Sequence, residues 1–166
     1  VQDGQADAVI SAGSTGAVVG GATLIWRLLP GVLKAGIAVD VGTKDRHTLL
    51  MDVGANVYCK PLHLLHYGLM AAVYVEKVLG INRPRVALLN IGSEETKGNE
   101  LVKETRELFS HAPFNFVGHV EGNDASRDGA GDVGRRRNRV VVDHCCECRR
   151  RGQGQVAGVG SLPDLA

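Results

Sequence analysis

The sequence predicts an α/β protein, with a three-layer α/β/α arrangement around a mostly parallel sheet. Two observations lead to this prediction. Short apolar runs of strand length alternate along the chain with longer segments of helical spacing. Glycine-containing polar loops follow three of these runs, a pattern typical of strand ends in such folds. The 166 residues, 44% of them hydrophobic, are enough for one domain with a buried core.

Five apolar runs have the length and the flanking turn residues of strands. The second and third are joined by a short turn, so we expect them to form an antiparallel hairpin. The other connections contain helical segments, which favours parallel neighbours. The five runs cover residues 6–11, 37–41, 48–53, 86–91 and 114–120.

Three segments have the pattern of helices. The clearest is 61–79, where apolar residues recur every three or four positions between Pro61, which suits a first turn, and Gly80, which suits a C-terminal cap. An apolar segment after the first strand is expected to be helical as far as about Leu29. The third helix is expected to run to about His111.

The composition changes near Asp124. Residues 1–124 contain all seven aromatic residues and both signs of charge, whereas 125–166 contain eight arginines, no lysine and three of the four cysteines. We therefore divide the chain into a folded segment, 1–124, and an Arg/Gly/Cys-rich tail, 125–166. The tail is expected to be disordered, or to be the product of GC-rich coding DNA translated in the wrong reading frame. The alternative is a genuine basic tail that binds nucleic acid or anionic lipid.

The first glycine loop is a candidate anion site. Gly13, Ser14, Thr15 and Gly16 offer backbone amides and two hydroxyls at the expected start of a helix, which suits phosphate. The glycine spacing is not that of a dinucleotide-binding fingerprint, and the Gly-Lys-Ser/Thr of a Walker A loop is missing. The plainer interpretation is a glycine turn in which Ser or Thr caps the helix.

Two further loops are expected at the same edge of the sheet. Asp52-Val-Gly-Ala-Asn56 places Gly54 between a carboxylate and an amide that could orient a phosphate or carbonyl oxygen, or that is simply tolerated in a left-handed turn. Loop 92–98 contains Lys97, whose ammonium could neutralise a bound anion or could be one more solvated charge. Because the carboxyl ends of parallel strands meet at one edge, we expect the three loops to converge.

Other patterns give weaker indications. Cys59 with His63 or His66 would be a nucleophile and its base only if the thiol lay beside an imidazole, and a small buried cysteine is the simpler interpretation. The cysteine cluster 144–148, which consists of Cys145, Cys146 and Cys148 after His144, lacks the spacing of a tetrahedral metal site. We expect no metal, no cofactor and no nucleic-acid partner. The polar start predicts no secretory signal, and apolar stretch 17–26 is too short to span a bilayer, so a cytoplasmic location is expected.

Seven motifs stand in a fixed order along the chain. They are Ser11-Ala-Gly-Ser-Thr-Gly-Ala17, Asp52-Val-Gly-Ala-Asn56, Cys59-Lys-Pro61, the segment 72–80, Leu88-Leu-Asn-Ile-Gly92, Glu94-Glu-Thr-Lys-Gly-Asn-Glu-Leu101 and Phe116-Val-Gly-His-Val-Glu-Gly122. Together they resemble the PlsX family of phosphate acyltransferases over residues 1–124. The motif that ends at Leu101 is the most specific of the seven.

The resemblance implies a fold similar to phosphate acetyltransferases and isopropylmalate dehydrogenases. It implies transfer of a fatty acyl group from acyl carrier protein to inorganic phosphate, giving acyl phosphate for phospholipid synthesis. It also implies a homodimer that associates peripherally with the membrane. Lys97 matches a lysine that the family needs for activity, and we assign it a catalytic role together with Asn99. The expected phosphate- and substrate-binding residues are Gly13, Ser14, Thr15, Gly16, Gly54, Asn56 and Gly98.

The chain departs from the family pattern at several places. Ser14 replaces the usual asparagine, and beyond Gly122 the family's valine-rich strand and Asp-Gly-Phe-x-Gly-Asn loop are expected to be missing. The family's Met-Gly-Gly-Asp loop is absent as well. We therefore expect an incomplete domain that is inactive by itself. The alternative function is that of an NAD-dependent dehydrogenase-like domain, in which Asp40 would bind the ribose.

Overall fold

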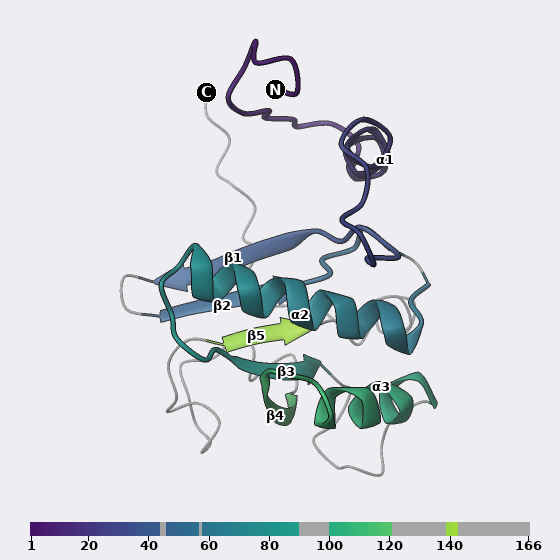
Figure 1. Cartoon of the computed structure of the whole chain (residues 1–166), viewed down its shortest axis with the longest axis vertical. Helices are drawn as coiled ribbons and strands as arrows, with labels where there is room; N and C mark the ends of the chain where they lie inside the picture. Colours follow the sequence, from purple (N-terminus) through teal and green to yellow (C-terminus); the bar gives the residue numbers. More distant parts are fainter. Residues whose placement is uncertain (44–45, 57, 90–99, 121–138, 143–166) are drawn as a thin grey trace, which may run out of the picture.

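The computed structural model describes residues 1–43, 46–56, 58–89, 100–120 and 139–142. These residues form three helices and five strands (Figure 1). In chain order they are α1 (Thr15–Ile25), β1 (Ala38–Thr43), β2 (Arg46–Met51), α2 (Pro61–Lys77), β3 (Arg85–Leu89), α3 (Glu100–Ser110), β4 (Asn115–Val120) and β5 (Arg139–Val142).

The five strands form one sheet in the order β1-β2-β5-β3-β4. β1 pairs with β2 in an antiparallel hairpin, and every other neighbouring pair is parallel. The mostly parallel sheet and the hairpin are therefore confirmed. The carboxyl ends of β2, β5, β3 and β4 meet at one edge, which is the edge where ligands bind in open α/β sheets.

Strand β5 corrects one prediction about the tail. It lies between β2 and β3 and is paired on both sides, and Val140, Val141 and Val142 are all fully buried. The expectation that the tail 125–166 is disordered therefore does not hold for Arg139–Val142. Three consecutive valines suit a strand that is buried on both faces, and this local preference outweighs the arginine-rich composition around them. The rest of 125–166 lies outside the described residues.

Helices α2 and α3 cover one face of the sheet (Figure 1). From α2 the residues that face the sheet include Leu64, Tyr67 and Val75, and from α3 they include Val102 and Phe109. The alternate strand residues meet them, as the period-two geometry of a strand requires. These strand residues are Leu49, Met51, Val86, Leu88, Val140 and Val142.

The opposite face of the sheet is also part of the interior. Ala87, Val141 and Val120 pack together there and are buried, with Leu50 and Leu89 beside them. A parallel sheet with both faces buried is what a three-layer arrangement requires. The fold class predicted from the alternation of strands and helices therefore holds.

The first thirty residues differ from this core. No residue of α1 is buried, and the predicted strand at 6–11 does not form in the structure. Ile10 in that segment is 99% exposed. The strand prediction was wrong because an apolar run becomes a strand only beside another strand to which it can hydrogen-bond. In Figure 1, α1 stands apart from the sheet and from α2, beyond the edge strand β1.

Candidate functional site

A buried carboxylate organises the loop that follows β2. Asp52 is 2% exposed, and its two oxygens accept four hydrogen bonds. Oδ1 accepts from the backbone N–H groups of Ile37 at 2.9 Å and Ala55 at 3.3 Å. Oδ2 accepts from the backbone N–H of Asn56 at 3.0 Å and from its side-chain Nδ2 at 2.7 Å. A buried charge with this many donors is satisfied internally and fixes the loop around it.

The side chain of Asn56 extends this network into the core. Its Nδ2 lies 2.7 Å from the carbonyl oxygen of Ala35 and 2.9 Å from the hydroxyl oxygen of Tyr67. The Tyr67 hydroxyl in turn donates to the same Ala35 carbonyl at 3.1 Å. Burial, followed by the neighbouring Cys59 and Asp52, raises the pKa of Tyr67 above its usual range. The tyrosine therefore stays neutral and can keep donating this hydrogen bond.

The geometry changes what can be expected of Asn56. Its amide nitrogen is occupied by Asp52, Ala35 and Tyr67, so it holds the loop to the core. The exposed tip of the loop is Gly54, which has a φ of 81°. Glycine adopts this left-handed conformation without a steric penalty, and its lack of a side chain lets a ligand approach the backbone. The loop therefore offers a rigid backbone surface at the sheet edge.

Sequence reasoning missed Tyr67 as part of this site. The residue stands among the apolar positions of α2 and its ring fills the core, so the pattern indicates packing alone. Gly36 also escaped notice. A Cβ atom at that position would lie 3.0 Å from a ring carbon of Tyr67 and 3.2 Å from the terminal methyl carbon of Met51. Only the three-dimensional structure shows that the segment before β1 must pass this close to the tyrosine.

Basic side chains surround the start of α2, beside the loop. Lys34 donates from its ammonium to the Tyr58 carbonyl oxygen at 2.7 Å. The backbone N–H of Lys60 donates to His63 Nδ1 at 3.1 Å, and that of Leu33 donates to His66 Nδ1 at 3.4 Å. Burial, then Lys34, Lys60 and His66 in that order, lower the pKa of His63.

These contacts bear on Cys59 as a possible nucleophile. Cys59 is half-buried and lies beside Tyr67. The Nδ1 atoms of His63 and His66 both accept backbone hydrogen bonds, which ties them to the chain around them. The packing role suggested for the cysteine fits this arrangement better than a nucleophile with a histidine base.

The glycine loop at 13–16 is placed differently from the expectation. Gly13, Ser14, Thr15 and Gly16 are all exposed, and Ser14 precedes α1 without a capping side-chain hydrogen bond. The backbone N–H of Gly13 donates to Ser11 Oγ at 3.2 Å. No hydrogen bond among the described residues joins this loop to Asp52–Asn56. The convergence of the two loops therefore stays a prediction.

Comparisons with known proteins decide the family. The family model described as "Fatty acid synthesis protein" matches residues 1–142. The chain belongs to this family. The matched region reaches the end of β5, which agrees with the place of that strand in the middle of the sheet.

Curated relatives that match this chain are named phosphate acyltransferase. The protein from Desulfitobacterium hafniense is 47% identical over 133 residues, which are 80% of this chain and 40% of the relative. The protein from Clostridium kluyveri is 48% identical over 133 residues, 80% of this chain and 39% of the relative. That from Bacillus cereus is 46% identical over 134 residues, 80% of this chain and 40% of the relative. The chain thus spans about 40% of the length of these relatives.

Solved structures support the fold. EutD phosphotransacetylase from Staphylococcus aureus matches with a TM-score of 0.55 at 19% identity, covering 85% of this chain and 47% of that one. A branched-chain phosphotransacylase from Enterococcus faecalis matches with a TM-score of 0.51 at 18% identity, covering 82% of this chain and 60% of that one. The arrangement of the strands and helices is therefore that of the phosphotransacetylases.

The most specific family motif lies outside the described residues. Lys97, Gly98 and Asn99 belong to the connection between Leu89, the last residue of β3, and Glu100, the first residue of α3. β3 runs parallel to β5, and β5 runs parallel to β2. The ends of β3 and β2 therefore lie at the same edge of the sheet, separated by one strand.

The structure contradicts the dehydrogenase alternative. Asp40 lies inside β1, the antiparallel edge strand, and does not follow the carboxyl end of a parallel strand. Its Oδ2 is 2.9 Å from Nδ1 of His47 across the hairpin. A ribose-binding acid follows a parallel strand next to the glycine loop, and Asp40 does not occupy that position.

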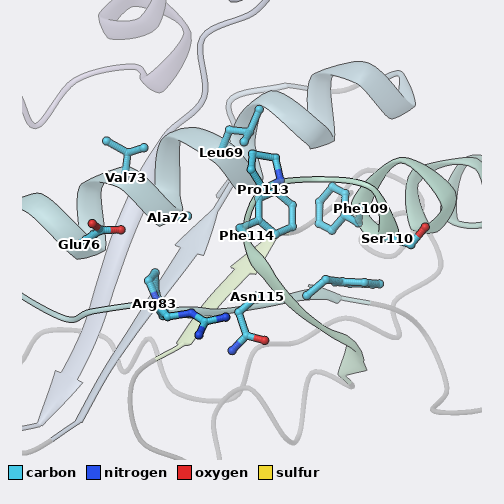
Figure 2. A pocket seen from close by; sticks show the side chains of 12 residues that line it. Leu69, Ala72, Val73, Glu76, Arg83, Phe109, Ser110, Pro113, Phe114 and Asn115 are labelled. Atoms are coloured by element: carbon cyan, nitrogen blue, oxygen red, sulfur yellow. The ribbon is translucent and has the colours of Figure 1, made fainter.

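A groove lies at the other edge of the sheet, near the amino ends of β3 and β4 (Figure 2). It has a volume of about 630 Å³. Phe109 meets Phe114 and Phe116 edge-to-face along it, with ring centroids 5.1 and 5.3 Å apart. Arg83 and Asn115 provide its polar side. None of the site residues predicted from the sequence lines this groove.

Within the part of the chain that the structure describes, no three histidine, cysteine, aspartate or glutamate side chains are grouped so that they could hold a metal ion. None of α1, α2 and α3 is both long and apolar enough to cross a membrane. The cysteine cluster 144–148 lies outside the described residues.

Proposed function

We propose that this chain forms the phosphate-binding part of an enzyme that transfers a fatty acyl group from acyl carrier protein to inorganic phosphate. The product is acyl phosphate, an intermediate for phospholipid synthesis. The observation that carries the proposal is the family match over residues 1–142, combined with a rigid glycine loop at the ligand-binding edge of the sheet.

The reaction needs little covalent chemistry from the protein. An oxygen of inorganic phosphate attacks the carbonyl carbon of the acyl thioester, the carbon–sulfur bond breaks, and the carrier leaves as a thiol after taking up a proton. The phosphate is itself the nucleophile, so no nucleophilic side chain is required. The protein has to hold a dianion against a carbonyl group and neutralise the charge that develops.

The proposed site divides these tasks between loops. The backbone at Gly54, held in place by Asp52 and Asn56, lies against the phosphate, and Lys97 supplies a full positive charge. Asn99 and Gly98 shape the remainder of the Lys97 loop. Gly13, Ser14, Thr15 and Gly16 join the site once that segment closes onto the sheet edge. We also propose a cytoplasmic homodimer that associates peripherally with the membrane.

The proposal is tested in a full-length family member that contains this segment. Incubation with palmitoyl-acyl carrier protein and phosphate should release carrier thiol and form acyl phosphate, trapped as the hydroxamate. Thiol release that does not depend on phosphate would contradict the proposal. So would binding of a nicotinamide cofactor without acyl phosphate formation, which would restore the dehydrogenase alternative.

Substitution of Lys97 tests its role directly. Lys97→Ala should lower kcat/KM for phosphate by about 100-fold or more, because one charge-stabilising group contributes that much to comparable reactions. The free energy of unfolding should change by less than about 0.5 kcal/mol, as for other loop side chains. Lys97→Arg should also be impaired because a planar fork does not replace a compact ammonium.

Lys103→Ala is the matched control for this substitution. Lys103 is an exposed lysine on α3, six positions further along the chain, and its removal should leave kcat/KM unchanged. Full activity of Lys97→Ala would remove the lysine from the mechanism. An equal loss in both variants would indicate a general effect of charge.

A further inference from the structure

Two segments that are distant in the sequence form an exposed surface at the start of α2. We name this surface the α2 entrance and define it by Leu33, Lys34, Tyr58, Lys60 and Leu62. The three apolar or aromatic members are exposed, with Tyr58 at 75%. Lys60 is exposed and Lys34 is partly buried along its stem. Large apolar side chains next to lysines on one exposed surface are typical of sites that bind a partner.

The α2 entrance is a built surface whose parts are tied together. The ammonium of Lys34 reaches the Tyr58 carbonyl at 2.7 Å, which joins residues 24 positions apart. The Leu33 backbone N–H donates to Nδ1 of His66 on α2, one turn after Leu62. Because both segments are anchored to α2, their side chains are presented together and little conformational entropy is lost when a partner binds.

Positive charge dominates this surface. Neither Lys34 nor Lys60 forms an ion pair with any carboxylate of the described residues. The N-terminal end of the α2 dipole adds partial positive charge at the same place. Burial lowers the pKa of His63, and the ammonium groups of Lys34 and Lys60 lower it further. The nearby carboxylate, Asp52, is buried and already accepts four hydrogen bonds.

The position of the α2 entrance connects it to the proposed reaction. Lys60 is four residues beyond Asn56, and α2 begins at the edge of the sheet where β5 and β3 end (Figure 1). A partner bound here would therefore lie next to the Gly54 loop. Since an acyl thioester must be brought to phosphate by its carrier, the partner that belongs at this place is the carrier.

We propose that the α2 entrance is the docking surface for the acidic carrier protein that delivers the acyl thioester. This inference rests on the proposed function and deepens it by naming where the carrier binds. Lys34 and Lys60 pair with carboxylates of the carrier, and Leu33, Tyr58 and Leu62 contact apolar side chains at the centre of the interface. Complementary charge guides the encounter and the buried apolar contacts hold the complex.

An anionic membrane is the other macromolecular surface with matching charge. Two lysines give only weak attraction to lipid headgroups, and stable membrane association ordinarily needs a larger basic cluster or an inserted apolar segment. The location beside the Gly54 loop also favours a partner that must reach the reacting phosphate. The charge and the position of the α2 entrance therefore favour a carrier protein over a membrane.

The test measures binding of palmitoyl-acyl carrier protein to this chain by titration calorimetry at about 50 mM and about 200 mM salt. The double charge reversal Lys34→Glu/Lys60→Glu should weaken binding by about tenfold or more, and the wild-type affinity should fall as salt rises. Tyr58→Ala should weaken binding at both salt concentrations. Lys77→Glu is the matched control, since Lys77 is an exposed lysine at the far end of α2, and it should bind like the wild type.

Each other result overturns the proposal. No binding by the wild-type chain, or equal binding by the double variant and the wild type, removes the α2 entrance as the docking surface. If the double variant no longer binds phosphatidylglycerol vesicles but still binds the carrier, the α2 entrance is a membrane-binding surface instead. The proposed function has a different readout, which is acyl phosphate formation by the full-length enzyme. If no acyl phosphate forms, the proposed function is wrong, whether or not the carrier binds to the α2 entrance.

Discussion

Helices α1 and α2 are both rich in apolar residues, yet only α2 is part of the core. α2 buries Leu64, Tyr67 and Val75 against the sheet, whereas α1 buries no residue. The exposed side of α2 also carries apolar or aromatic residues, among them Leu62, Val73 and Tyr74, so the two helices differ little in how their apolar residues are distributed. Apolar content therefore does not place a helix. The sheet surface beneath α2 does, because it gives Leu64, Tyr67 and Val75 something to pack against.

The difference between the two helices is tested most directly by replacing one leucine in each. Leu64 is 0% exposed and Leu24 is 83% exposed. Leu64→Ala should lower the free energy of unfolding by about 3 kcal/mol, through lost burial and the cavity left behind. Leu24→Ala should change it by less than about 0.5 kcal/mol because alanine and leucine have similar helix propensities. Urea unfolding of both variants provides the measurement.

A large destabilisation by Leu24→Ala would show that α1 is packed in solution, against what the exposure of its side chains indicates. A cost below about 1 kcal/mol for Leu64→Ala would show that α2 is not the centre of the core.

Glycine-to-alanine substitutions should have opposite signs in the two helices. At Gly68 in α2, an added Cβ would lie 3.2 Å from ring atoms of Phe109 and Phe114. Gly68→Ala should therefore destabilise the protein by about 1–3 kcal/mol, as overpacking generally does. At Gly20 in α1, nothing lies within 4 Å of an added Cβ. Gly20→Ala should raise the helix content by circular dichroism because alanine is the better helix former.

Stabilisation by both substitutions would mean that the aromatic cluster beneath α2 can rearrange. Destabilisation by Gly20→Ala would reveal a close neighbour of α1 and remove the contrast between the helices.

The same contrast explains what could be predicted from the sequence. The spacing of Leu62, Leu65 and Leu69 predicted α2, and the short turn predicted the hairpin of β1 and β2. The residues of a strand do not show which other strand it will pair with in the sheet. For that reason the run at 6–11 was wrongly assigned as a strand, and the valines of β5 were hidden within an arginine-rich segment.

The candidate site was predictable only in part. The motif Asp52–Asn56 was identified, but the sequence did not show that Asp52 accepts four hydrogen bonds or that Asn56 turns toward the core. Tyr67 looked like any other core residue of α2. These roles arise because segments before β1, after β2 and within α2 come into contact in the folded protein. The spacing of residues along the chain does not show such contacts.

Tyr67→Phe tests the polar link between α2 and the loop, because it keeps the ring and removes the hydroxyl group that contacts Ala35, Asn56 and Cys59. The ring and its packing remain, while the hydrogen bonds to the Ala35 carbonyl and from Asn56 Nδ2 are lost. The free energy of unfolding should fall by about 1 kcal/mol, the usual cost of losing a buried hydroxyl partner. Amide hydrogen exchange should quicken at Ala55 and Asn56 and stay unchanged in α1. Unchanged exchange in the loop would show that Asp52 alone holds it.

The smallest expected effect is on the pH dependence of stability, and it too belongs to α2, since α1 contains no titratable side chain. Burial, followed by the neighbouring Lys34, Lys60 and His66, lowers the pKa of His63 in the folded state. Its Nδ1 also accepts a hydrogen bond from the Lys60 backbone, which needs an unprotonated nitrogen. The unfolded chain therefore binds the proton more readily, so stability rises with pH in this range.

The His63 contribution is present above the unfolded pKa of about 6.5 and is lost as the pH falls through that value toward the lower folded pKa. His63→Gln should flatten the dependence of the unfolding free energy on pH between about 7.5 and about 5. Lys60→Met keeps the histidine but removes one of the cations that oppose its protonation, so this variant should show an intermediate slope. An equal slope in wild type and His63→Gln would mean that the imidazole meets no net penalty for charging, and the α2 entrance would then be less positive than the geometry indicates.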